Sequence, residues 1–153
     1  MQKYNFKLQP LLNKELIYEC ECSRMLGVLR GVFQEENDKL EELKVRKVEY
    51  QKELKEKKQH RITPAELTIY EYYFVKLNYK INTGKQVLEE IMKKLRAVQS
   101  ELAKIIKKRK TLEKLKDRGE EEFKYNLNLS LNKEMDEIGM TKFNKSRRPD
   151  TVI

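Results

Sequence analysis

The residues that could carry out acid–base, thiol or metal chemistry in this chain are few, and their spacing does not suit it. Cys20 and Cys22 are two residues apart, so on a helix they point about 200° apart and can neither bond easily nor share a metal. His60 is the only histidine, which leaves no ligand set for zinc and no serine–histidine pair. The carboxylate runs fall on predicted exposed helix faces, at Glu41-Glu42, Glu89-Glu90 and Glu120-Glu121-Glu122. We therefore predict no enzyme, no metal, no cofactor and reduced thiols.

Positive charge is concentrated in one segment. Lys93–Arg118 holds eleven lysines or arginines against three acidic residues, which is +8 of the chain's net +9. This stripe is either a solvated helix face, partly balanced by Glu15, Glu19 and Glu21, or a docking stripe for an acidic partner. It has no interleaved aromatic side chains on which bases could stack, so nucleic acid is not the expected partner.

Aromatic side chains crowd the stretch from Tyr70 to Tyr79. Tyr70 and Phe74 fit the apolar spacing of a helix, whereas Tyr72, Tyr73 and Tyr79 lie off it. A cluster of exposed tyrosines favours protein contacts, since tyrosine offers a large area at low entropic cost. The sequence leaves two interpretations open here: a partner-binding site, or rings that flank a widened seam.

A long helix must position these groups. From Leu67 to Leu112 residues recur at alternating spacings of three and four, and twelve of the fourteen positions are apolar. The positions are Leu67, Tyr70, Phe74, Leu77, Ile81, Gly84, Leu88, Ile91, Leu95, Val98, Leu102, Ile105, Arg109 and Leu112. An average spacing of about 3.5 residues gives one narrow seam that another helix must cover, which is typical of a coiled coil.

Three features of the sequence indicate where this helix begins. Thr63 and Glu66 form a predicted capping box, Pro64 occupies the first helical position, and Ile62 with Leu67 suits a hydrophobic staple. A helix beginning at Pro64 is therefore expected, after a turn at residues 60–63.

A second helical pattern precedes the turn. Its apolar stripe drifts along the chain, as an α-helix does when its period is nearer 3.6 than 3.5. The predicted seam is Leu8, Leu11, Tyr18, Cys22, Met25, Leu29 and Val32, with Leu12, Leu26 and Phe33 beside it, continuing through Leu40, Leu43, Tyr50 and Leu54.

These patterns predict an all-α fold, a long two-helix antiparallel coiled-coil hairpin. We expect one hairpin domain over residues 1–141, with helices at about 6–59 and 64–138 and a stop at Gly139, followed by a basic disordered tail at 142–153. Residues 117–141 lack a partner within the hairpin, and the sequence leaves open whether they are ordered alone or only on binding. No run of about 18 apolar residues and no secretory leader is seen, which predicts a cytoplasmic protein.

Three segments in this order resemble a known family. They are Phe6-Lys7-Leu8-Gln9-Pro10-Leu11-Leu12, the basic run from Lys107 to Arg118, and Met135-Asp136-Glu137-Ile138. Together with the hairpin and the chain length, they resemble FliJ, the flagellar type III export stalk protein.

The resemblance implies a coiled coil similar to the central stalk of rotary ATPases. Such a protein would sit in the hexameric export ATPase ring and promote its assembly, contact the membrane export gate from the cytoplasmic side, and help escort export chaperones. By the same resemblance, the positions facing the gate would be Leu43, Tyr50, Tyr73 and Leu77. Tyr50 and Leu77 also fall on seam positions.

The residues expected to contact the ATPase are chosen from charge and from the pairing of the two helices. They are Phe6, Leu8, Leu11, Lys107, Lys108, Arg109, Lys110, Lys114 and Arg118. Two other functions remain open: a self-assembling structural coiled coil, and a basic coiled coil that binds nucleic acid.

Overall fold

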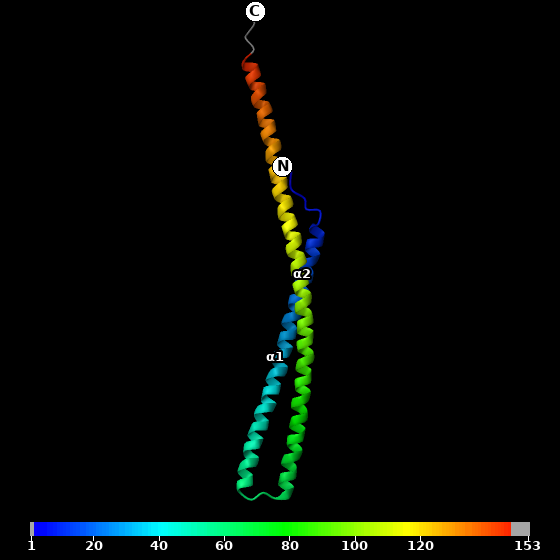
Figure 1. Cartoon of the computed structure of the whole chain (residues 1–153), viewed down its shortest axis with the longest axis vertical. Helices are drawn as coiled ribbons and strands as arrows, with labels where there is room; N and C mark the ends of the chain where they lie inside the picture. Colours follow the sequence, from blue (N-terminus) through cyan, green and yellow to red (C-terminus); the bar gives the residue numbers. More distant parts are fainter. Residues whose placement is uncertain (1, 148–153) are drawn as a thin grey trace, which may run out of the picture. The chain divides into compact units, whose positions relative to one another are not determined.

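The chain folds into two α-helices, α1 and α2. The computed structural model describes residues 2–147, in which α1 spans Gln9–Gln59 and α2 spans Pro64–Ser146, with no strand among the described residues. Figure 1 shows the two helices joined by the short loop at residues 60–63. The predicted all-α helical hairpin is confirmed.

The start of α2 follows the predicted cap. The Glu66 amide donates to the Thr63 hydroxyl over 3.3 Å, and the Leu67 amide donates to the Thr63 carbonyl over 3.1 Å. The bond to the hydroxyl satisfies an amide that has no partner inside the helix, and the bond to the carbonyl is the first of the helix itself. The first helix begins at Gln9 rather than near residue 6, and Pro10 lies in its first turn, where its missing N–H costs nothing.

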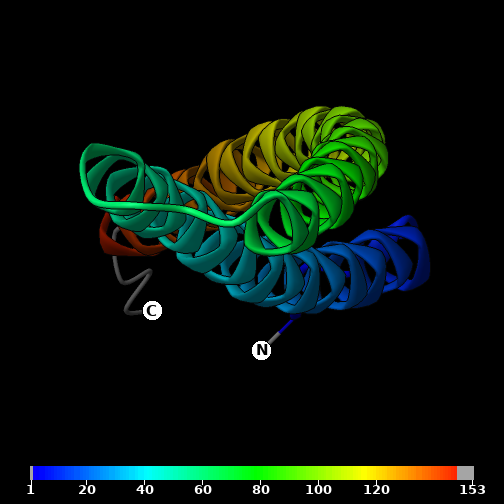
Figure 2. The same ribbon diagram turned by 90° about the horizontal axis from the view of Figure 1, so that it is seen from below.

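The chain divides into two compact units, which we describe separately. The loop unit is Ile17–Ile105, and the terminal unit combines the chain up to Leu16 with α2 from Ile106 onward. In the loop unit α1 and α2 run antiparallel, and Figure 2 looks onto the loop that joins them. Leu26, Ile91 and Leu95 form its buried cluster, at 8%, 8% and 6% exposure. Leu29, Phe33, Val87, Val98 and Leu102 pack around them.

In the terminal unit the start of α1 packs on α2. Leu12 and Leu112 are buried, at 4% and 9% exposure. The extended residues before α1 continue this cover, because the rings of Tyr4 and Phe123 lie 5.8 Å apart. A Cβ built on Gly119 would collide with the Tyr4 hydroxyl, so the ring rests directly on the glycine backbone.

The seam of α2 is confirmed over its whole predicted length. Six of its fourteen positions are buried and the other eight are half-buried. Gly84 fits this seam because a Cβ there would lie 3.1 Å from the Leu40 side chain, a tight contact. Arg109 is half-buried and pairs with Glu113, the guanidinium lying 2.9 Å from the carboxylate.

The predicted seam of α1 is wrong in its first half. Leu8, Leu11, Tyr18, Met25 and Val32 are exposed. The positions turned inward instead follow an unbroken three-four spacing: Leu12, Glu15, Glu19, Cys22, Leu26, Leu29, Phe33, Glu36, Leu40, Leu43, Lys47, Tyr50 and Leu54. Glutamates and a lysine occupy four of these positions, so a search for apolar residues alone misses this stripe.

The predicted end of the second helix is also wrong. Instead of stopping at Gly139, α2 runs to Ser146, which places residues 142–146 of the predicted tail in a helix. Glycine ends a helix by adopting a positive φ, and none of the described glycines does so. The rest of the predicted tail, residues 148–153, lies outside the described residues.

Candidate protein-binding surfaces

The four residues predicted to face the gate have different environments in the loop unit. Leu77 is buried, at 3% exposure, so it supports the packing and cannot reach a partner without unfolding. Leu43, Tyr50 and Tyr73 are half-buried. Three of the four predicted gate residues are thus only partly accessible to a partner.

Tyr50 and Tyr73 belong to an aromatic cluster between the helices. Their rings stack, with centroids 4.1 Å apart and planes 24° apart. The Tyr50 ring also lies 5.6 Å from that of Tyr70 and meets the edge of Phe74 at 6.2 Å. Offset and edge-on contacts of this kind stabilise a fold. For Tyr73 this favours the interpretation that the ring flanks the seam.

Two other tyrosines are free to contact a partner. Tyr72 and Tyr79 are 70% and 72% exposed. Tyr79 borders a shallow hollow of about 300 Å³, together with Leu43, Lys80 and Gly84. Leu43 is therefore the predicted gate residue with the best access to a partner. The sequence indicates that Tyr79 is exposed, because its position on the helix lies off the apolar seam.

A cation sits on the aromatic cluster close to the loop. The Lys57 ammonium lies 5.1 Å from the centroid of the Tyr70 ring. The pKa of Lys57 is raised above its ordinary value, first by hydrogen bonding to Tyr70 and then by the electrostatic interaction with Tyr70. Glu66 and Glu53 make smaller contributions in the same direction. The pair ties the end of α1 to the start of α2.

The terminal unit carries the predicted ATPase-binding residues. Of the six predicted cations, five are exposed: Lys107, Lys108, Lys110, Lys114 and Arg118. The sixth, Arg109, turns into the seam and is held by Glu113, so it has less access to a partner. Of the apolar residues chosen with them, Leu8 and Leu11 are exposed and Phe6 is half-buried.

Three of these predicted residues come together around one hollow. Leu11 from α1 and Lys107 and Lys108 from α2 line a depression of about 320 Å³. Its wall includes Glu15, which is only 9% exposed. From the sequence, Glu15 is predicted only to be a counter-charge to the basic stripe. The three-four spacing from Leu12 was the signal that would have placed it in the seam.

The described residues also bear on other chemistry. Within residues 2–147 neither α1 nor α2 contains an apolar stretch of the length that a membrane span requires, and no three His, Cys, Asp or Glu side chains gather as metal ligands. Cys20 is exposed and Cys22 half-buried, both as free thiols.

Comparison with known proteins gives one match. No curated protein and no solved structure matches the chain significantly. The family model described as flagellar FliJ protein matches residues 4–148, which is nearly the whole chain. The chain therefore belongs to the FliJ family, whose members are adaptor components of the flagellar export apparatus rather than enzymes.

Proposed function

We propose that this protein is the stalk of the flagellar export ATPase complex. In this role the chain inserts into the hexameric ATPase ring, promotes assembly of the ring and links it to the membrane export gate. It catalyses no reaction itself. It works in the cytoplasm, at the inner face of the cell membrane, and helps to escort export chaperones.

One observation carries the proposal, namely the exposed basic surface of the terminal unit. Lys107, Lys108 and Lys110 extend from α2 within four residues, and Leu11 of α1 lies beside the first two. Cations with an apolar neighbour suit an acidic protein surface, where charge steers the encounter and apolar contact supplies affinity. A ring of ATPase subunits that surrounds this surface would meet it from several sides.

The loop unit supplies a separate surface for the gate. The hollow beside Leu43 and Tyr79 combines an accessible leucine with an exposed aromatic ring. Tyrosine is enriched among the few residues that supply most of the binding energy at protein interfaces. We therefore assign the gate contact to this hollow, with Tyr50, Tyr73 and Leu77 holding the underlying helix in place.

Charge reversal tests the ATPase contact. The variant Lys107→Glu/Lys108→Glu/Lys110→Glu should stimulate hydrolysis by the cognate export ATPase at least about tenfold less than the natural chain, because attraction becomes repulsion. Arg109 is left in place because it pairs with Glu113. The matched control is Lys133→Glu/Lys142→Glu/Lys145→Glu, three exposed lysines farther along α2. Unchanged stimulation by the first variant would remove this surface from the mechanism.

The gate contact needs its own variant. Tyr79→Ala should weaken binding of the gate's cytoplasmic part and leave ATPase stimulation intact, since the ring is 72% exposed. Leu77→Ala, a substitution at a buried position, should instead lower the melting temperature. Gate binding that survives Tyr79→Ala would move the contact elsewhere.

Self-assembly is the second candidate, and one observation favours it. Beyond Tyr125, large apolar side chains of α2 are exposed, among them Met135 at 71%, Met140 at 67% and Phe143 at 58%. A second copy could cover them. This function predicts a dimer that survives dilution, measured by analytical ultracentrifugation, whereas a stalk is compatible with a monomer.

A further inference from the structure

The loop unit has a second groove that the export role does not use. Its cavity of about 420 Å³ lies between α1 and α2 near the loop, lined on the α1 side by Lys47, Lys55 and Lys58. Among the described residues none of these three ammonium groups is in an ion pair. By contrast, Lys39 and Lys44 of the same helix each pair with a glutamate of α1 over 3.3 Å.

The acidic residues on this part of α1 lie away from the face that lines the groove. The groove lysines and Gln51 lie at spacings of four, four and three, which keeps them on one side of the helix. At about 100° per residue, Glu49, Glu53 and Glu56 lie about 140° or more from Gln51, on the opposite side. No acidic residue lines the groove. Positive potential is therefore concentrated where the cavity opens.

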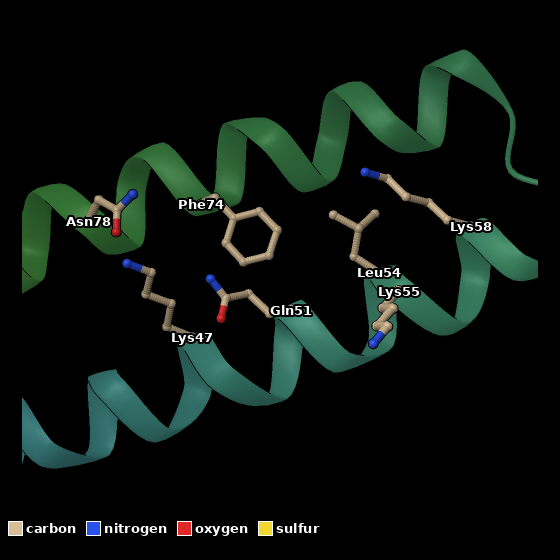
Figure 3. A pocket seen from close by; sticks show the side chains of 7 residues that line it. All are labelled: Lys47, Gln51, Leu54, Lys55, Lys58, Phe74 and Asn78. Atoms are coloured by element: carbon tan, nitrogen blue, oxygen red, sulfur yellow. The ribbon is translucent and has the colours of Figure 1, made fainter.

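The groove also has an apolar floor and polar walls. Leu54 and Phe74 are half-buried, and Figure 3 shows both side chains between the two helices. In the same view Lys47 and Lys58 extend from α1 toward α2 on either side of the Phe74 ring. Gln51 and Asn78 add amides, which both donate and accept hydrogen bonds.

We propose that this groove binds an extended acidic peptide segment of a partner protein. Carboxylates of the segment pair with the three lysines, its backbone meets the two amides, and an apolar side chain rests on Leu54 and Phe74. From Lys47 to Lys58 the helix rises about 16 Å, a length that an extended chain covers in about five residues. Binding of this peptide does not depend on the export role. The residues that line the groove are different from those that line the hollow beside Leu43.

The same features disfavour two other anionic occupants. A nucleic acid would need a ring face for base stacking, but Phe74 is half-buried and already packs edge-on against Tyr50 at 6.2 Å. A membrane surface would need cations that point outward together, whereas Lys47 and Lys58 reach across the groove (Figure 3). The amides suit a peptide backbone better than phosphate oxygens, which only accept.

Fluorescence anisotropy with the full chain tests the proposal. The probe is a labelled peptide of alternating Asp and Leu, and its comparison is the same peptide with Asn in place of Asp. The natural chain should bind the first and not the second. The variant Lys47→Gln/Lys55→Gln/Lys58→Gln should weaken binding at least about tenfold, because charge-assisted hydrogen bonds are lost.

A matched variant controls for net charge. Lys52→Gln/Lys76→Gln/Lys85→Gln removes the same charge from exposed positions of the same unit that do not line the groove, and should weaken binding less than about twofold. Helicity and melting temperature verify that both variants fold. Absence of binding, or equal loss in the two variants, would overturn the proposal. So would a single-stranded RNA or an anionic vesicle that binds through the groove lysines while the peptide does not.

Discussion

Two stretches of α2 both carry large apolar side chains but differ in how far these are buried. Between Leu67 and Leu112 every position of the stripe is buried or half-buried. From residue 128 to residue 147 every described residue is exposed, including Met135, Ile138 and Phe143. The first stretch has α1 against it, and the second has no other described segment of the chain to cover it.

The comparison shows that apolar spacing determines which face a helix can bury, while the partner determines whether it does. In the terminal unit the cover continues past the start of α1 through Tyr4, whose ring lies 5.8 Å from that of Phe123. Burial of apolar area is worth about 25 cal/mol per Å², so the covered stretch stabilises the fold. The uncovered stretch keeps that free energy available for binding.

The largest expected effect comes from placing the same charge in each stretch. Leu95→Asp puts a carboxylate at a position with 6% exposure and should destabilise the hairpin by about 4 kcal/mol or more. Met135→Asp, at 71% exposure, should change stability by less than about 0.5 kcal/mol. Thermal denaturation followed by circular dichroism measures both. Equal losses would mean that the second stretch is covered in solution.

A smaller effect should separate covered from uncovered rings in the loop unit. Tyr50→Ala removes the ring that contacts Tyr70, Tyr73 and Phe74 and should cost about 3 kcal/mol. Tyr72→Ala, at a ring with 70% exposure, should cost less than about 0.5 kcal/mol. Urea denaturation gives both values. A large loss from Tyr72→Ala would reveal a contact that the cluster does not include.

Gly119→Ala tests where the cover ends in the terminal unit. Its Cβ would occupy the place of the Tyr4 hydroxyl, so the N-terminal segment should leave α2 and its amides should exchange hydrogen faster. The net change in stability should be small, because alanine gains about 1 kcal/mol of helix propensity over glycine. Tyr4→Ala should give the same faster exchange at residues 2–8. Unchanged protection in both variants would contradict the contact.

The smallest effect concerns Lys57, which is fully exposed. Because contact with Tyr70 raises its pKa, the stabilisation is complete below the ordinary lysine pKa and disappears as pH rises through the folded pKa. The melting temperatures of the natural chain and Lys57→Gln should therefore differ by a constant amount near neutral pH, and converge in strong alkali. Lys52→Gln serves as the control. A difference between the two melting temperatures that grows with pH would contradict this prediction.

Most of the fold could be predicted from the sequence. The α2 seam was predicted correctly because leucine and isoleucine mark its positions. The helix start at Pro64 was predicted correctly because Thr63 caps it. The first half of the α1 seam could not be predicted from apolar residues, since Glu15 and Glu19 occupy inward positions there. Only regular spacing, tested without regard to polarity, would have found it.

The candidate surfaces were harder to predict. Leu43 is half-buried and borders a hollow, whereas Leu77 is a packing residue and Arg109 turns inward to Glu113. Sequence spacing shows which face a residue occupies, not how far its side chain is covered by the opposite helix. The groove at Lys47, Lys55 and Lys58 depends on both helices, so neither pattern alone could indicate it.

The stoichiometry of ring assembly tests the proposed stalk most directly. Purified export ATPase can be titrated with this chain while mass photometry counts the hexamers that form. A stalk on the axis of a closed ring predicts that hexamer formation saturates at about one chain per six ATPase subunits. The variant Lys107→Glu/Lys108→Glu/Lys110→Glu should then fail to promote it. No added hexamer, or saturation at one chain per subunit, would contradict a central stalk.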